Sequence, residues 1–77
     1  MRIQVLGMGC PKCKQLTANA EEAVRQMGLE AEIEKITNLK EIMKFGVMAT
    51  PALAIDGEVK SMGRVLSPAE IMGLLNP

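Results

Sequence analysis

Residues 7–13 read Gly-Met-Gly-Cys-Pro-Lys-Cys, and they separate two segments of different periodicity. Before this stretch, the apolar side chains of residues 2–6 predict a buried β-strand. After it, apolar side chains recur at helical spacing from Cys13 onward until Gly28, a natural helix stop. Pro11 stands where the first residue of a helix belongs. The stretch therefore predicts a strand that ends at a turn and a long helix that begins at two cysteines.

The middle of the chain predicts one strand and one short helix. Residues 30–35 alternate acidic with mainly apolar side chains, a pattern typical of a strand with one polar face. Asn38 followed by Glu41 resembles a capping box, so a short helix begins there and ends at Gly46. The apolar residues of that helix are Leu39, Ile42 and Met43.

The last third predicts a hairpin and a final helix. Residues 52–55 are strand-like, and Asp56-Gly57 is a two-residue turn into a second strand at residues 58–61. Ser67-Pro68-Ala69-Glu70 is a capping box with proline at the first helical position. The chain therefore begins its last helix at a well-marked position.

The element order is β-α-β-α-β-β-α. A right-handed first crossover makes the first two strands parallel, and the short turn makes the last two antiparallel. We expect residues 1–77 to form one α/β domain, with a four-stranded mixed sheet and helices packed on its faces.

Composition excludes several partners. Nine basic and nine acidic residues give a formal net charge of zero, and Phe45 is the only aromatic residue. A chain without a basic face or aromatic side chains to stack on bases is not expected to bind nucleic acid. The apolar runs fall far short of the roughly 20 residues that span a bilayer, and the first residues lack the pattern of a secretory signal. We expect a cytoplasmic monomer that does not associate with membranes.

Seven methionines accompany the lack of aromatic residues. Methionine adapts to irregular gaps in a core, and we expect Met43, Met48, Met62 and Met72 to fill such gaps. The alternative is that they form a soft binding surface near the cysteines.

The pair Cys10 and Cys13 predicts thiol–disulfide chemistry. Two intervening residues at the start of a helix bring both sulfurs within bridging distance. Cys10 would be the N-cap, where free backbone N–H groups and the helix dipole favour a thiolate, and Lys12 and Lys14 add positive charge nearby. Cys13 lies on the apolar stripe one turn later. We expect Cys10 to be the attacking thiol and Cys13 the resolving thiol.

Two other interpretations of the same residues stay open. Residues 7–13 also resemble the Gly-Met-x-Cys-x-x-Cys loop of heavy-metal-associated domains, which carry Cu(I) between two thiolates. That fold ends in a strand, whereas this chain predicts a final helix. A closed structural zinc site normally needs four ligands, and the chain has two cysteines and no histidine. The second interpretation is a non-catalytic binding module.

Residues 46–57 supply a second motif, because Thr50-Pro51 precedes a strand and a hairpin turn. This segment resembles the thioredoxin superfamily, whose members hold a cis-proline there. With the cysteine motif and the element order, the resemblance covers essentially the whole chain. It is most similar to the small, aromatic-poor, thioredoxin-like or glutaredoxin-like redox-active disulfide proteins of bacteria and archaea.

The resemblance implies a thiol–disulfide oxidoreductase that needs no cofactor or metal beyond its Cys10–Cys13 disulfide. It implies that the bond before Pro51 is cis, and that the backbone beside Thr50 pairs with an extended substrate segment close to the cysteines. Its partners would be disulfide-containing proteins and a thiol reductase or low-molecular-weight thiol. The residues that it implies shape the site are Gly9, Pro11, Lys12, Thr50 and Pro51.

The chain departs in several respects from the families that it resembles. Gly9 replaces the tryptophan that precedes the first cysteine in ordinary thioredoxins, and Pro11-Lys12 replaces Gly-Pro. Glutaredoxins grip glutathione with a Gly-Gly turn and an acidic residue, whereas this chain offers only Gly63-Arg64. No acidic residue is clearly placed to accept the proton of Cys13. Dependence on glutathione is therefore not supported by the sequence.

Overall fold

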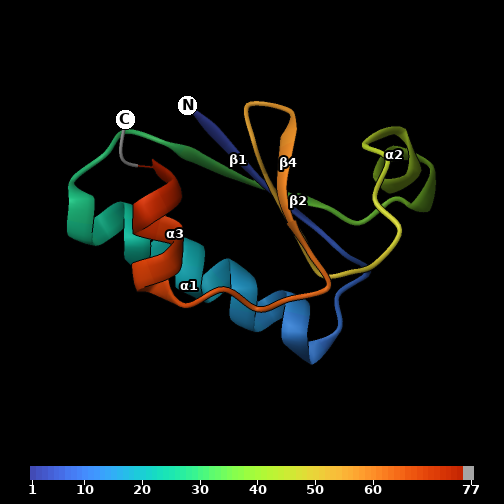
Figure 1. Ribbon diagram of the computed structural model, residues 1–77, viewed down its shortest axis with the longest axis horizontal. Helices are drawn as coiled ribbons and strands as arrows, with labels where there is room; N and C mark the ends of the chain where they lie inside the picture. Colours follow the sequence, from blue (N-terminus) through green and yellow to red (C-terminus); the bar gives the residue numbers. More distant parts are fainter. Residues whose placement is uncertain (76–77) are drawn as a thin grey trace.

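The computed structural model describes residues 1–75 and contains four strands and three helices within them. Their order confirms the predicted β-α-β-α-β-β-α arrangement (Figure 1). The elements are β1 (Arg2–Leu6), α1 (Pro11–Met27), β2 (Glu32–Ile36), α2 (Leu39–Lys44), β3 (Ala52–Ile55), β4 (Glu58–Met62) and α3 (Pro68–Leu75). Within these 75 residues, no helix combines the length and the apolar character needed to cross a bilayer.

The four strands form one mixed sheet in the order β2-β1-β3-β4. Strand β1 runs parallel to β2 and antiparallel to β3, and β3 runs antiparallel to β4. The hairpin turn between β3 and β4 has positive φ at both central residues, 50° at Asp56 and 85° at Gly57. Both parts of the predicted topology are confirmed. Strand β2 begins two residues later than predicted and includes Ile36, and β4 extends by one residue to Met62.

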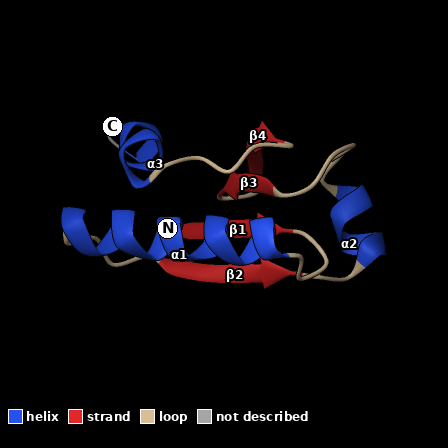
Figure 2. Ribbon diagram, turned by 90° about the horizontal axis from the view of Figure 1, so that it is seen from below, coloured by secondary structure: helices blue, strands red, loops and turns tan. Residues whose placement is uncertain are grey.

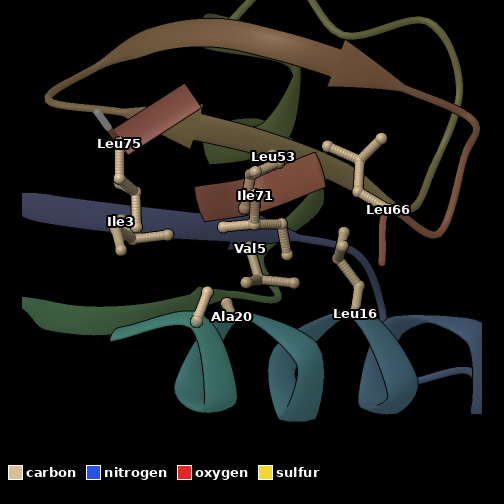
Figure 3. Packing of buried hydrophobic residues seen from close by; sticks show 9 residues of the cluster. Ile3, Val5, Leu16, Ala20, Leu53, Leu66, Ile71 and Leu75 are labelled. Carbon is tan, nitrogen blue, oxygen red and sulfur yellow. The ribbon is translucent and has the colours of Figure 1, made fainter. Parts of the chain in front are cut away.

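The three helices are distributed unequally around the sheet (Figures 1 and 2). Helices α1 and α3 lie next to each other on one face, and α2 lies apart at one end of the sheet (Figures 1 and 2). The larger core fills the space between α1, α3 and the sheet (Figure 3). Its buried members are Ile3, Val5, Leu16, Ala20, Ala23, Leu53, Leu66, Ile71 and Leu75. A smaller cluster beside α2 comprises Leu6, Ile42, Val47, Ala52 and Ala54.

The helix ends follow the sequence signals. Gly28 ends α1 in the left-handed conformation, with φ 63°. At the start of α3, the Glu70 backbone N–H donates to Ser67 Oγ and the Ser67 N–H donates to Glu70 Oε1, both at 3.1 Å. This is the reciprocal capping box that the sequence predicts. The Asn19 side chain donates to the Leu66 carbonyl at 2.8 Å, so α1 is tied to the segment that leads into α3.

The prediction that the methionines fill the core is wrong for three of them. Met48 is 93% exposed, Met43 65% and Met62 47%, whereas Met72 is half-buried against the larger core. Aliphatic side chains from α1, α3 and the sheet already fill that core, and the Met48 side chain is left exposed on its loop although its neighbour Val47 is buried. Leu39 is also exposed, so only Ile42 of the expected apolar face of α2 is buried.

Replacement of Ile71 by alanine tests the packing of α3 on the sheet. Ile71 is fully buried at 0% exposure, and the cavity left by Ile71→Ala should lower the free energy of unfolding by about 2–5 kcal/mol. Leu74 lies on the same helix at 39% exposure, so Leu74→Ala is the matched control and should cost less than about 1 kcal/mol. Urea denaturation of the reduced proteins measures both values. Equal costs would show that α3 does not pack as described.

Candidate active site at the start of the long helix

The turn between β1 and α1 places two cysteines at the beginning of a helix. Gly9 adopts φ 86°, a left-handed conformation that favours glycine, and lets the chain turn into the helix. Cys10 is the N-cap with extended backbone angles, and Pro11 is the first helical residue. The Cys10 carbonyl accepts the first helical bond, from the Lys14 N–H at 3.1 Å. The local sequence therefore fixes where the helix begins and which cysteine caps it.

The two sulfurs lie next to each other but in different surroundings. The Cys10 and Cys13 Sγ atoms are 2.7 Å apart as free thiols, and the Cys13 backbone N–H donates to Cys10 Sγ at 3.3 Å. Cys10 is exposed to solvent, whereas Cys13 is only 5% exposed, one turn into the helix. The Cys10 sulfur is therefore accessible to a partner molecule, whereas the Cys13 sulfur is buried next to it.

These surroundings move the two thiol pKa values in opposite directions. The hydrogen bond from the Cys13 side chain is the main cause that lowers the pKa of Cys10, and the Cys13 backbone N–H lowers it further. Burial is the main cause that raises the pKa of Cys13, and its hydrogen bond to Cys10 adds to the rise. Because the thiolate is the nucleophile in thiol–disulfide exchange, the geometry favours Cys10 as the first reactive group.

The loop before β3 lies beside the cysteines. The Thr50-Pro51 peptide bond is cis, and the Pro51 ring is buried. The Pro51 carbonyl accepts a hydrogen bond from the Gly63 N–H at 2.8 Å, which fixes the loop to the end of β4. Gly7, the residue after β1, lies between this loop and the resolving cysteine, because a Cβ atom there would be within 4 Å of both Pro51 Cα and Cys13 Sγ. In Figure 1 the loop before β3 passes the end of β1.

The remaining candidate residues are exposed at the surface. Lys12 is exposed, as is Lys14, and Thr50 is exposed beside the buried proline. Met8 and Met48 are both exposed, each two residues before a key position, Cys10 and Thr50 respectively. Arg64, which follows Gly63 where glutaredoxins have a glutathione-binding turn, forms an ion pair with Glu70 at 3.2 Å.

Sequence reasoning missed the small cavity beside Cys13. Its volume is about 100 Å³, and its lining includes two lysines and two threonines but no carboxylate. The lining residues are Val5, Gly7, Gly9, Cys13, Lys14, Thr17, Lys35 and Thr37. The sequence could have indicated two of these lining residues. Thr17 lies one helical turn after Cys13, and Lys35 is paired with Val5 in the parallel register. The cavity supplies no acidic group to take the proton of Cys13.

Comparison with known proteins decides the family. A family model described as a thioredoxin domain matches residues 1–76. The chain belongs to the thioredoxin superfamily. It is similar to a thioredoxin of Methanothermobacter thermautotrophicus, with 49% identity over 76 residues that cover 99% of both chains. It is also similar to a thioredoxin of Methanocaldococcus jannaschii, with 41% identity over 69 residues that cover 90% of this chain and 79% of the relative.

A solved structure of a malarial protein has the same thioredoxin-like fold. It is 15% identical, with a TM-score of 0.70 over 96% of this chain and 91% of that one. The family and the two archaeal thioredoxins show that this chain is a thiol–disulfide oxidoreductase that works through a cysteine pair without a cofactor. Nothing in these comparisons favours the alternative of a heavy-metal-associated domain, because the family model and both archaeal relatives are thioredoxins.

The hydrogen bond between the two side chains can be tested through the pKa of Cys10. Cys13→Ala removes the main group that stabilises the Cys10 thiolate, so the pKa of Cys10 should rise towards the ordinary value of about 8.5. Cys13→Ser is the matched control, because its hydroxyl still donates a hydrogen bond and should produce a smaller rise. The ultraviolet absorbance of the thiolate, followed against pH, measures each value. Identical pKa values in Cys13→Ala and Cys13→Ser would contradict the assigned cause.

Proposed function

We propose that this thioredoxin-family protein reduces disulfides with Cys10 as the attacking thiol and Cys13 as the resolving thiol. One observation carries the proposal: an exposed N-cap sulfur with a lowered pKa lies beside a buried sulfur with a raised pKa. A disulfide in another protein can reach Cys10 directly. Cys13 is shielded from that protein until the first exchange has taken place.

The reaction proceeds through two exchanges. The Cys10 thiolate attacks one sulfur of the target disulfide, forming a mixed disulfide, and the other target sulfur leaves as a thiolate that takes up a proton. Cys13 then loses its proton and attacks the Cys10 sulfur, which releases the second target thiol. The target gains two electrons, and the protein is left with a Cys10–Cys13 disulfide.

Neighbouring residues position the two cysteines and bind the target. Gly9 and Pro11 set the turn that makes Cys10 the N-cap, and Lys12 adds positive charge beside it. Pro51 packs near the resolving cysteine, and the backbone at exposed Thr50 pairs with an extended segment of the target. Apolar side chains of the target segment contact the exposed methionines Met8 and Met48, which flank the two loops.

The partners follow from the two half-reactions. Disulfide-containing proteins accept the two electrons and are reduced. A thiol reductase or low-molecular-weight thiol then reduces the Cys10–Cys13 disulfide back to the dithiol. We place this cycle in the cytoplasm, where the reducing environment keeps most thiols free. Residues 1–77 act as a single thioredoxin-like domain and as a monomer.

The two cysteines should fail in different ways when replaced. Cys13→Ser should accumulate a covalent mixed disulfide between Cys10 and a disulfide-containing substrate such as insulin, because no second thiol resolves it. Cys10→Ser removes the attacking sulfur and should give neither adduct nor turnover. Non-reducing electrophoresis and mass spectrometry identify the adduct, and turnover is followed by precipitation of reduced insulin. An adduct that forms on Cys13 in Cys10→Ser, faster than on Cys10 in Cys13→Ser, would reverse the roles.

A further inference from the structure

Gly7 is buried against the resolving cysteine. A Cβ atom at this position would overlap Cys13 Sγ and lie 3.2 Å from Cys13 Cβ. The backbone of Gly7 is outside the left-handed region, so its conformation suits any L-residue and does not itself require glycine. The requirement for glycine comes from the Cys13 side chain, chiefly from its sulfur.

The backbone is held in place on both sides of this contact, at Gly7 and at Cys13. The Gly7 N–H donates to the Ile36 carbonyl at 3.0 Å, which fixes it to the end of β2, and Pro51 Cα would lie 3.9 Å from an added Cβ atom on the other side. Cys13 is held in α1, where its carbonyl accepts from Thr17 Oγ1 at 3.0 Å. A methyl group at residue 7 must therefore displace the Cys13 sulfur rather than the backbone.

We propose that Gly7 is a positioning residue that sets the dithiol–disulfide equilibrium by leaving space for the reduced Cys13 sulfur. This inference rests on the proposed function of the cysteine pair. A disulfide bond holds the two sulfurs about 2.05 Å apart, whereas two thiol sulfurs repel at that distance and need more room. The reduced Cys13 sulfur occupies the space that a side chain at residue 7 would fill, so a side chain there disfavours the dithiol more than the disulfide, in which the Cys13 sulfur is drawn towards Cys10.

The relevant reaction is oxidation by glutathione disulfide. The protein dithiol gives up two electrons and two protons and forms the Cys10–Cys13 bond, while the glutathione S–S bond breaks and yields two molecules of glutathione. A methyl group at residue 7 destabilises the reactant dithiol more than the product disulfide. The equilibrium constant of this oxidation should therefore increase.

The experiment compares Gly7→Ala with wild type in glutathione redox buffers, with the fraction of disulfide measured by alkylation and mass spectrometry. We expect the equilibrium constant for oxidation to rise at least tenfold, which corresponds to a reduction potential about 30 mV more negative. Gly73→Ala is the matched control, because Gly73 has no atoms within 4 Å of an added Cβ, and its equilibrium constant should stay unchanged. An unchanged or smaller constant in Gly7→Ala would overturn the inference.

A second variant separates the contact from a general loss of folding. In a Cys13→Ala background the sulfur is absent, so Gly7→Ala should lower the urea midpoint of the reduced protein much less than it does when Cys13 is present. Equal losses in both backgrounds would overturn the inference, even if Gly7→Ala alone fails to fold. A wild-type pair that does not oxidise reversibly would instead reject the proposed function itself.

Discussion

The hydrogen bonds between Cys13 and the Cys10 sulfur are the interaction on which this site depends. They come from the side chain and from the backbone N–H, and together they favour negative charge on the exposed sulfur. Burial opposes charge on Cys13, so the pKa values of the two thiols are shifted in opposite directions. A helix that begins at Cys10 supplies one part of this difference, because the N-cap position brings the Cys13 backbone N–H to the Cys10 sulfur.

The rest of the fold holds that helix start against the sheet. Leu16, one turn beyond the cysteines, is buried in the core with Ile71 of α3, and the bond from Asn19 to the Leu66 carbonyl ties the two helices together. On the other side, β1 ends at Gly7, which is bound to β2 and adjacent to the loop of Pro51. The end of β1, the start of α1 and the loop of Pro51 therefore meet near the Cys13 sulfur.

Local signals made most of the fold predictable from sequence. The helix starts at Cys10 and Ser67 and the turn at Asp56-Gly57 are each decided by a few neighbouring residues, and the structure has each of them. Properties that depend on packing between distant segments were not predictable. The exposure of Met48 and the contact between Gly7 and Cys13 follow from how the loops meet, and no local pattern marks either of them.

The central claim is that Cys10 is the more reactive of the two thiols at neutral pH. Timed alkylation of the reduced protein with iodoacetamide, quenched at intervals and mapped by mass spectrometry after proteolysis, tests it most directly. We expect Cys10 to be modified first and Cys13 to stay protected while the protein is folded. Modification of Cys13 before Cys10 would contradict it.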